Sequence, residues 1–482
     1  MHINVFHVDS GPNKNWGSNY GKKIFDNYFF YLRVAADPAS AKFINTFLIK
    51  IGGPPLVNSQ EIAKYLAKFD FVWIRSMESD DIADPNTGKK YLGSTWVAIK
   101  HYNPRTIIYT HADLCQIDVR YTVCTTHNAN NAFYLRTANR YDNGCGHSMG
   151  ASGSLYSLWY HNKNGKLLNG HNKNFKLLNP GNSKTLKYVI EAWETDFLNK
   201  PWTADGVASD GCCSEPSTCN IGIPGMDAFA PIEFSTVDEY MDDMSKYLSR
   251  FSDFLHANKK GLAVNHGGPK ARPEWQKIDS LGSVDYLMEE GVFVVWWGTG
   301  RPGSTKHNVN FLNYNEWLYD LELIQTTKKI PVMVQTHCKL KPGETGIDNF
   351  GKTVNAWDAF YYGLASFLLA KKESDLYLHR MAVGYNNIYQ YFDEYDSLNF
   401  GEALGKYQIK KYGKVNIYFR EFEKGYVFVN PTQWNAITIS LPQFCKQRTH
   451  DNLDQSIDSL PDILTINLDA HRAALSYKSI VK

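Results

Sequence analysis

Acidic and polar side chains stand at the ends of several short β-rich runs in the sequence. Asp210 ends one such run, and the pair Glu289 and Glu290 ends another. The other polar groups in this position are His111, Asp113, Asn265 and His266. Two carboxylates from non-adjacent strands that face one cavity are the minimum machinery for cleaving an acetal, one as nucleophile or base and the other as acid. These residues therefore indicate hydrolysis of a glycosidic bond, which requires no metal and no cofactor.

Alternation along a strand separates two nearby aspartates. Asp205 and Asp210 are five residues apart, so they face opposite sides of a regular strand. We expect Asp210, at the strand end, to be the catalytic candidate and Asp205, at the strand start, to be structural. Only one of Glu289 and Glu290 can face the same cavity, and their spacing does not say which. Each of these carboxylates could instead serve as a turn, helix-cap or solvated surface residue.

Other chemistries lack their motifs in this sequence. No GxSxG elbow, P-loop, HExxH or dinucleotide-binding GxGxxG occurs in the required context, and the glycine-rich stretch 298–303 is better explained as a loop over the site. The clustered cysteines have no second CxxC or HxxxH partner, so we expect no metal site. Short disulfides are the alternative, with Cys219 paired to Cys212 or Cys213.

Eight β-rich runs separated by helical stretches must position these residues. The runs are 69–75, 106–111, 154–160, 204–210, 261–266, 285–291, 331–336 and 375–380. Eight such βα units predict an α/β fold, a (β/α)8 TIM barrel, with the active site at the carboxyl ends of its strands. Helical spacing of apolar residues also predicts helices after Ser235 and over 354–370.

The pattern changes to alternating strands after residue 404, which predicts a C-terminal antiparallel β-domain over 405–482. We assign 61–404 to the catalytic barrel and 1–60 to an N-terminal decoration packed on it. Arg420 lies in one of the C-terminal strands, where a guanidinium group commonly ties a strand to carbonyls or a carboxylate at a domain interface. We therefore expect Arg420 to be structural.

Composition and charge exclude several classes of partner. The 482 residues carry a net charge of +2, which provides no large field for holding a phosphate backbone, so nucleic acid is not expected. No apolar run of ~18 residues occurs, so no membrane span is expected. The start of the chain lacks the pattern of a signal peptide, which leaves the localisation open: secreted if a signal peptide was removed, and cytoplasmic otherwise. The oligomeric state stays open.

Several phrases in a fixed order carry a resemblance to a known family. They are 178–182 (LNPGN), 204–210 in place of a "DGVFxD" strand, 264–265, 285–290 in place of a "DxxMxE" strand, and the hairpin 418–431. Together they resemble the glycoside hydrolases grouped as hypothetical glycosyl hydrolase family fifteen, over roughly residues 60–440. The resemblance implies a TIM barrel with a C-terminal β-sandwich domain and hydrolysis of a polysaccharide or glycan.

The resemblance also implies roles for individual residues. Asp210 matches the aspartate that ends strand four, as nucleophile or general base, and Glu290 matches the glutamate that ends strand six, as general acid. Related barrels use the strand-four aspartate as nucleophile, which favours retention. The expected carbohydrate-binding residues are His111, Asp113, Asn265, His266, Trp296 and Trp297, with the two tryptophans as stacking faces. The competing function is a non-catalytic glycan-binding or structural protein on a degenerate barrel.

Overall fold

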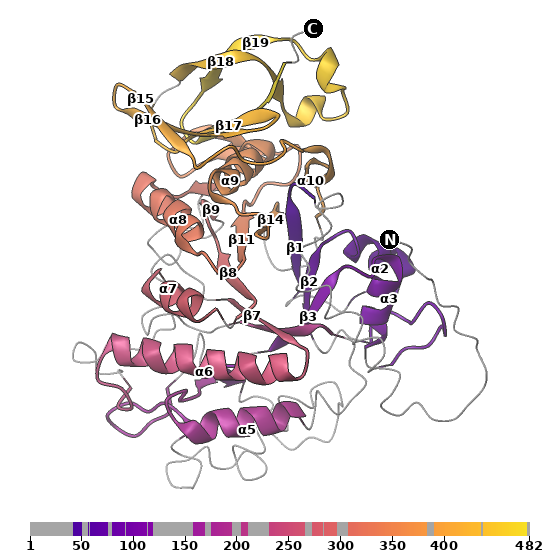
Figure 1. Ribbon diagram of the computed structural model, residues 1–482, viewed down its shortest axis with the longest axis vertical. Helices are drawn as coiled ribbons and strands as arrows, with labels where there is room; N and C mark the ends of the chain where they lie inside the picture. Colours follow the sequence, from indigo (N-terminus) through magenta and orange to yellow (C-terminus); the bar gives the residue numbers. More distant parts are fainter. Residues whose placement is uncertain are drawn as a thin grey trace. The chain divides into compact units, whose positions relative to one another are not determined.

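The structure, a computed structural model, describes residues 42–50, 56, 58–75, 80–91, 93–112, 114–118, 158–168, 175–194, 204–210, 231–265, 272–282, 284–295, 307–382, 390–434 and 437–479. Eight parallel strands of this part of the chain close into a barrel (Figure 1). Their order around it is β1 (Asn45–Lys50), β14 (Leu376–Arg380), β11 (Val332–His337), β8 (Tyr286–Glu290), β7 (Gly261–Asn265), β6 (Gly206–Ser209), β3 (Ile107–Ala112) and β2 (Phe71–Arg75). The predicted (β/α)8 barrel is therefore confirmed.

Two details of the barrel differ from the prediction: one strand was missed, and one predicted run forms no barrel strand. β1 lies in the segment 1–60 that we expected to decorate the barrel, yet it pairs with both β2 and β14 and closes the sheet. The predicted strand 154–160 is wrong, because its described part forms only an isolated bridge between Trp159 and Leu178. Tyr160 of this run packs instead against Phe234 and Tyr240. Tyr160 thus packs in a loop and has no place in a barrel strand.

Helices separate consecutive barrel strands, as the fold requires. They are α2 (Gln60–Leu66), α3 (Ser94–Tyr102), α5 (Ser183–Trp193), α6 (Val237–Ala257), α7 (Arg272–Leu281), α8 (Tyr314–Thr326) and α9 (Ala356–Ala370), with α10 (Glu394–Ser397) after β14. The predicted helix after Ser235 is α6, whose cap Thr236 accepts a hydrogen bond from the Glu239 backbone N–H. No helix in the described part of the chain is both long and apolar enough to cross a membrane.

Short antiparallel pairs occupy the loops that follow the carboxyl ends of barrel strands. They are β4 (Gln116–Asp118) with β5 (Phe175–Leu177), β9 (Val294–Val295) with β10 (Asn310–Phe311), and β12 (Thr345–Ile347) with β13 (Thr353–Asn355). The loops therefore carry regular structure next to the rim where a TIM-barrel site is expected.

Aromatic rings fill the amino end of the barrel interior. Tyr286 packs against Phe71 and Tyr109, which belong to strands that are not its neighbours, at centroid distances of 5.1 and 6.1 Å. A Cβ at Gly206 would lie 2.6 Å from the Tyr109 ring, so this close approach requires glycine. Because Tyr286 faces the interior, alternation places Glu290 of the same strand on the interior side as well.

An aspartate directly before a strand ties that strand to the preceding barrel strand at four places. The four ties are Asp70 Oδ2 to Thr46 N (2.8 Å), Asp205 Oδ2 to Ile108 N (2.8 Å), Asp285 Oδ2 to Leu262 N (2.7 Å) and Asp375 Oδ1 to Val332 N (2.8 Å). Each carboxylate accepts from a backbone N–H at the amino end of the sheet, where an unpaired donor would cost free energy. Asp205 therefore has the structural role that its position at the strand start predicted.

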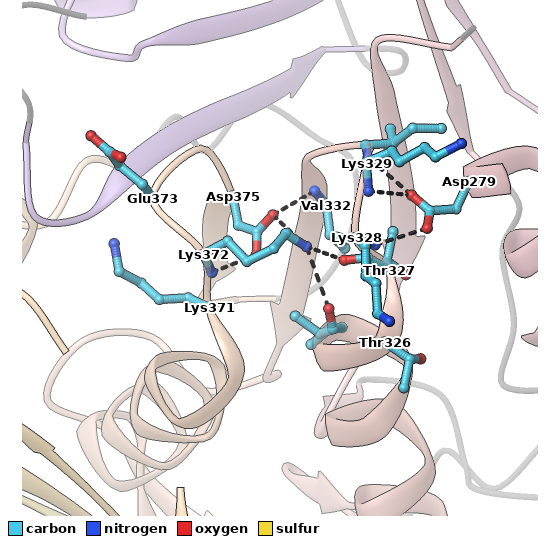
Figure 2. Close-up of polar contacts among 12 residues, drawn as sticks. Asp279, Thr326, Thr327, Lys328, Lys329, Val332, Lys371, Lys372, Glu373 and Asp375 are labelled. Atoms are coloured by element: carbon cyan, nitrogen blue, oxygen red, sulfur yellow. Dashed lines mark hydrogen bonds and ion pairs between the residues drawn. The ribbon is translucent and has the colours of Figure 1, made fainter. Parts of the chain in front are cut away.

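The Asp375 side chain, which makes one of these ties, is fully buried. Figure 2 shows its contacts with Val332 and Lys372. Its Oδ2 accepts from Lys372 N at 2.8 Å, and Lys372 Nζ lies 3.2 Å from Oδ1 and donates to Thr327 O. Burial raises the pKa of Asp375, and the charge of Lys372 opposes that effect. Nearby, Asp279 accepts from the backbone N–H groups of Lys328, Lys329 and Ile330. These contacts fix the loop between α8 and β11.

We predict that Asp375→Ala lowers the free energy of unfolding by about 3 kcal/mol, because two backbone donors lose a charged acceptor in a buried position. Chemical denaturation measures this loss. The matched control is Glu373→Ala, which removes an exposed carboxylate two residues away and should change stability by less than about 0.5 kcal/mol. Equal effects of the two substitutions would contradict the structural role of the tie.

The C-terminal domain is a six-stranded antiparallel sheet around its own core. The strand order is β15 (Gln408–Tyr412), β16 (Val415–Phe422), β17 (Gly425–Asn430), β20 (Arg472–Lys478), β18 (Ile437–Arg448) and β19 (Ile463–Leu468), with short 3-10 turns η7 (His450–Asn452) and η8 (Ile457–Ser459). β18 pairs with β19 and then, after a register shift between Ser440 and Cys445, with β20. Residues of both halves, such as Phe428 and Ile466, share one buried cluster. This two-layered arrangement agrees with the predicted β-sandwich.

Arg420 of β16 joins the C-terminal domain to the last turn of α9. Its Nη1 donates to Leu368 O at 3.1 Å and to Lys371 O at 2.9 Å, and its Nε donates to Gly405 O at 2.9 Å. The Leu368 and Lys371 carbonyls lie at the end of α9, where carbonyls lack a helical N–H partner, so the guanidinium group supplies the missing donors. The predicted structural role of Arg420 is confirmed.

We expect Arg420→Met to lower the free energy of unfolding by roughly 2–3 kcal/mol, since three hydrogen bonds from a charged donor are lost. Turnover of the folded variant should stay unchanged, because Arg420 contacts backbone carbonyls of α9 and of the chain before β15. Lys414→Met, in an exposed turn, is the control for removing a surface charge. A variant with a normal melting temperature and no turnover would show that the structural role is wrong.

Candidate active site

Two carboxylates meet at one amide at the carboxyl end of the barrel. Asn265 Nδ2 donates to Asp210 Oδ1 at 2.9 Å and lies 3.4 Å from Glu290 Oε2. Asp210 follows β6, Asn265 ends β7 and Glu290 ends β8, so three neighbouring strands supply the group. The structure thus brings together three of the residues that sequence reasoning singled out.

The spacing of the two carboxylates bears on stereochemistry. Because the same nitrogen contacts both, Asp210 Oδ1 and Glu290 Oε2 lie at most about 6.3 Å apart. Carboxyl groups are ~5–5.5 Å apart in retaining enzymes and ~6.5–9.5 Å apart in inverting ones, which need room for a water molecule. This limit applies to one oxygen of each carboxyl group and not to the separation of the whole groups, so the contact brings the two carboxylates to one site and is compatible with either stereochemistry.

The two adjacent glutamates of β8 face opposite sides of the sheet. Glu290 faces the interior and Asn265, whereas Glu289 is buried on the other side, toward α8. Burial raises the pKa of Asp320 in α8 well above its ordinary value, and the charge of Glu289 raises it further. Glu289 is therefore a neighbour of Asp320, and Glu290 is the member of the pair that faces the site.

Asp210 and His111 also lie on the interior side. Ser209 Oγ accepts from Leu114 N, so Ser209 faces outward and the residues on either side of it face inward. His111 of β3 pairs in register with Ala208 of β6, and its Nδ1 accepts from Trp73 Nε1 at 3.1 Å. An accepting Nδ1 leaves the proton of a neutral imidazole on Nε2.

Four of the predicted sugar-binding residues and three of the clustered cysteines are not among the residues that the structure describes. Asp113, His266, Trp296 and Trp297 lie outside the described residues, and so do Cys212, Cys213 and Cys219. No cluster of three or more His, Cys, Asp or Glu side chains that could hold a metal ion is found in the part of the chain that the structure describes.

Sequence reasoning missed the polar residues on two further strands. Gln335 and His337 lie at the carboxyl end of β11, and Arg380 ends β14 opposite His337. Burial holds the pKa of His337 well below its ordinary value, with Arg380 and His379 adding to the effect, so this imidazole is neutral at neutral pH. The rule that found Asp210, a polar residue closing a β-rich run, would also have found these residues had it been applied to β11 and β14.

Comparison with known proteins gives structural likeness only. No family model and no curated protein matches the sequence. Among solved structures, isomaltulose synthase from Klebsiella sp. LX3 is 10% identical, with 92% of this chain and 100% of that chain covered and a TM-score of 0.49. The γ-CGTase of alkalophilic Bacillus clarkii is 12% identical, with coverage of 91% and 71% and a TM-score of 0.46. A maltogenic α-amylase from Thermotoga neapolitana is 10% identical, with coverage of 91% and 99% and a TM-score of 0.42. At these values the likenesses assign no activity, and the barrel rests on its strand pairing.

The amide of Asn265 should offset repulsion between the two carboxylates. In Asn265→Leu this donor is lost, so the folded state binds a proton more readily than the wild-type folded state does. Stability relative to the wild type should therefore fall, on the order of 1 kcal/mol, as the pH rises from about 4 to about 7. Melting temperatures across this range measure the effect.

The control for this prediction adds Asp210→Asn to the Asn265→Leu variant. When this double variant is compared with Asp210→Asn alone, the repulsion between the two carboxylates is absent, so the pH-dependent part of the stability difference should become smaller. The remainder reflects the contact of Asn265 Nδ2 with Glu290. A stability difference between Asn265→Leu and the wild type that is the same at every pH would contradict the proposed repulsion.

Proposed function

We propose that this protein is a retaining glycoside hydrolase in which Asp210 is the nucleophile and Glu290 the general acid and base. The observation that carries the proposal is the contact of one amide, Asn265 Nδ2, with both carboxylates at the carboxyl end of a closed barrel. Two carboxyl groups that face one site are what acetal cleavage requires, and the analogy with related barrels supports retention. The site also lies at the end of the barrel where TIM-barrel enzymes carry their catalytic residues.

The reaction would proceed in two steps. Glu290 donates its proton to the glycosidic oxygen while an Asp210 oxygen bonds to the anomeric carbon and the leaving group departs. Glu290, now a carboxylate, takes a proton from water, and that water replaces Asp210 at the anomeric carbon. Asn265 holds the two carboxyl groups in place through both steps, since its Nδ2 contacts one oxygen of each.

The substrate class is also part of the proposal. The ordered phrases of the sequence resemble hypothetical glycosyl hydrolase family fifteen, which supports a polysaccharide or glycan substrate. His111, on the interior side next to β6, would hydrogen-bond the sugar through Nε2, because Nδ1 already accepts from Trp73. Asp113, His266, Trp296 and Trp297 stay proposed sugar-binding residues on the sequence alone.

Substitutions of the two proposed catalytic carboxylates, with Glu289 as the control, test this function. Glu290→Gln and Asp210→Asn should each lower kcat/KM roughly 10²–10⁴-fold on any aryl glycoside or polysaccharide that the wild type hydrolyses. Glu289→Gln, the same change one residue away on the outward face, should retain activity within about 10-fold. The anomer formed first, followed by proton NMR, should have the configuration of the substrate.

Two results would contradict the proposal. Full activity in Asp210→Asn would show that Asp210 is not the nucleophile. Inversion at the anomeric carbon would exclude the covalent intermediate. If the wild type binds glycans but hydrolyses none of a broad panel, the non-catalytic glycan-binding function is correct instead.

A further inference from the structure

The side chain of Gln335 is buried with both of its polar atoms unused. It has no exposed surface, and neither Oε1 nor Nε2 has a hydrogen-bond partner among the described residues. Leaving a buried donor or acceptor unsatisfied is energetically unfavourable, so native proteins seldom keep such a group without a purpose.

Gln335 faces the interior of the barrel. Its neighbour Thr336 faces outward, because Thr336 Oγ1 lies 2.8 Å from the Tyr377 hydroxyl and 2.7 Å from His379 Nδ1. A Cβ at Gly363 of α9 would lie 3.1 Å from Thr336, which places this residue against the helix. Since side chains alternate along a strand, Gln335 faces the opposite way, into the barrel.

One polar neighbour stands beside Gln335 at the same level of the barrel. In the parallel ladders Gln335 pairs with Glu290 of β8 on one side and with Leu378 of β14 on the other. Adjacent strands are ~4.8 Å apart, so the amide is within reach of the Glu290 carboxyl group. The Gln335 carbonyl also accepts from Gly291 N and Val292 N, at 2.9 and 3.0 Å, which fixes the chain directly after Glu290.

The burial of Gln335 decides between two roles. The Gln335 side chain has no surface that a water molecule can contact. A sugar is larger than water, so its hydroxyl groups cannot reach Gln335 either, and direct recognition of the substrate is disfavoured. Leu378 on the other side is apolar and offers no hydrogen bond. The Glu290 carboxyl group, which is only partly buried and borders the site, is the partner that the register provides.

We infer that Gln335 is a positioning residue for Glu290 that serves both of its protonation states, an inference that rests on the proposed function. Its Oε1 accepts from the protonated carboxyl group before bond cleavage, and its Nε2 donates to the carboxylate formed when the proton has moved to the glycosidic oxygen. In the second step Glu290 takes a proton from water, and Gln335 Oε1 again accepts a hydrogen bond from the protonated carboxyl group. Asn265, on the other side of Glu290, contributes an Nδ2 donor.

Other ionisable groups also surround Glu290. Asp210 faces Glu290 across Asn265, and His111 lies on the interior face of β3. His337 follows Gln335 by two residues on β11, and Arg380 of β14 pairs with it in register. Glu289 faces away, toward α8. A substitution of Gln335 by an uncharged residue leaves this set of charges unchanged, so a change in the ionisation of Glu290 can be assigned to the lost amide.

Gln335→Met is the test variant, because it removes both hydrogen-bonding atoms and keeps an unbranched side chain. Leu378→Met, an interior residue at the same level, controls for altered packing. On aryl glycosides with poor leaving groups, kcat/KM of Gln335→Met should fall roughly 10-fold, since one to two hydrogen bonds to the acid are lost. With a 2,4-dinitrophenyl leaving group, which needs no protonation, the loss should be less than about 3-fold. The basic limb of the pH profile should also move to higher pH, because Glu290 loses a donor that stabilises its ionised form.

Two results would overturn the inference. A loss of activity that is the same for every leaving group would mean that Gln335 contacts the sugar or maintains the fold. An effect in Leu378→Met equal to that in Gln335→Met would assign the change to packing.

A readout without turnover separates this inference from the proposed function. Carbon-13 NMR of labelled glutamate carboxyl groups, with Glu290 assigned by the Glu290→Gln variant, follows the titration of Glu290 directly. Its midpoint should be higher in Gln335→Met than in the wild type, because the hydrogen bond from Nε2 to the carboxylate is charge-assisted and is the stronger of the two that are lost. An unchanged midpoint refutes the role even if the enzyme is active. If no glycoside is hydrolysed but the midpoint shifts, the proposed function fails and the contact between Gln335 and Glu290 stands.

Discussion

Closure of the barrel is the constraint on which the rest of the structure depends. β1 pairs with β2 on one side and with β14 on the other, so the sheet has no free edge and the eight strands end at a common rim. The candidate site exists because three of these strands, β6, β7 and β8, are neighbours at that rim. A carboxylate on β6 and one on β8 therefore lie one strand apart, with the amide of Asn265 between them.

The same residue type has different roles at the two ends of the barrel. At the amino end, the aspartates before β2, β6, β8 and β14 accept hydrogen bonds from backbone N–H groups of the preceding barrel strands. At the carboxyl end, Asp210 and Glu290 contact a side-chain amide and border the interior. Asp205 and Asp210 show the contrast on a single strand, since one holds the sheet and the other faces the site. The residues of the candidate site are thus separate from the contacts that hold the sheet together.

The sequence predicted most of this arrangement, because period-two alternation and strand ends are local features. It identified all but one of the barrel strands and placed Asp210 and Asp205 correctly on opposite faces. β1 was missed because the run NTFLIK is short and stands alone before the clear βα repeats, and its partners are remote in sequence. The choice of Glu290 over Glu289 and the interior position of Gln335 depend on packing against α8 and α9, which spacing along one strand does not contain.

The central claim is that Asp210 forms a covalent bond to the sugar. A fluorinated glycosyl fluoride of the sugar that the enzyme hydrolyses slows the second step and allows the intermediate to accumulate. Peptide mass spectrometry of the trapped protein locates the bound sugar. We predict one adduct on the peptide containing Asp210, absent in Asp210→Asn. An adduct on another carboxylate, or none under conditions where the substrate is turned over, would contradict the account.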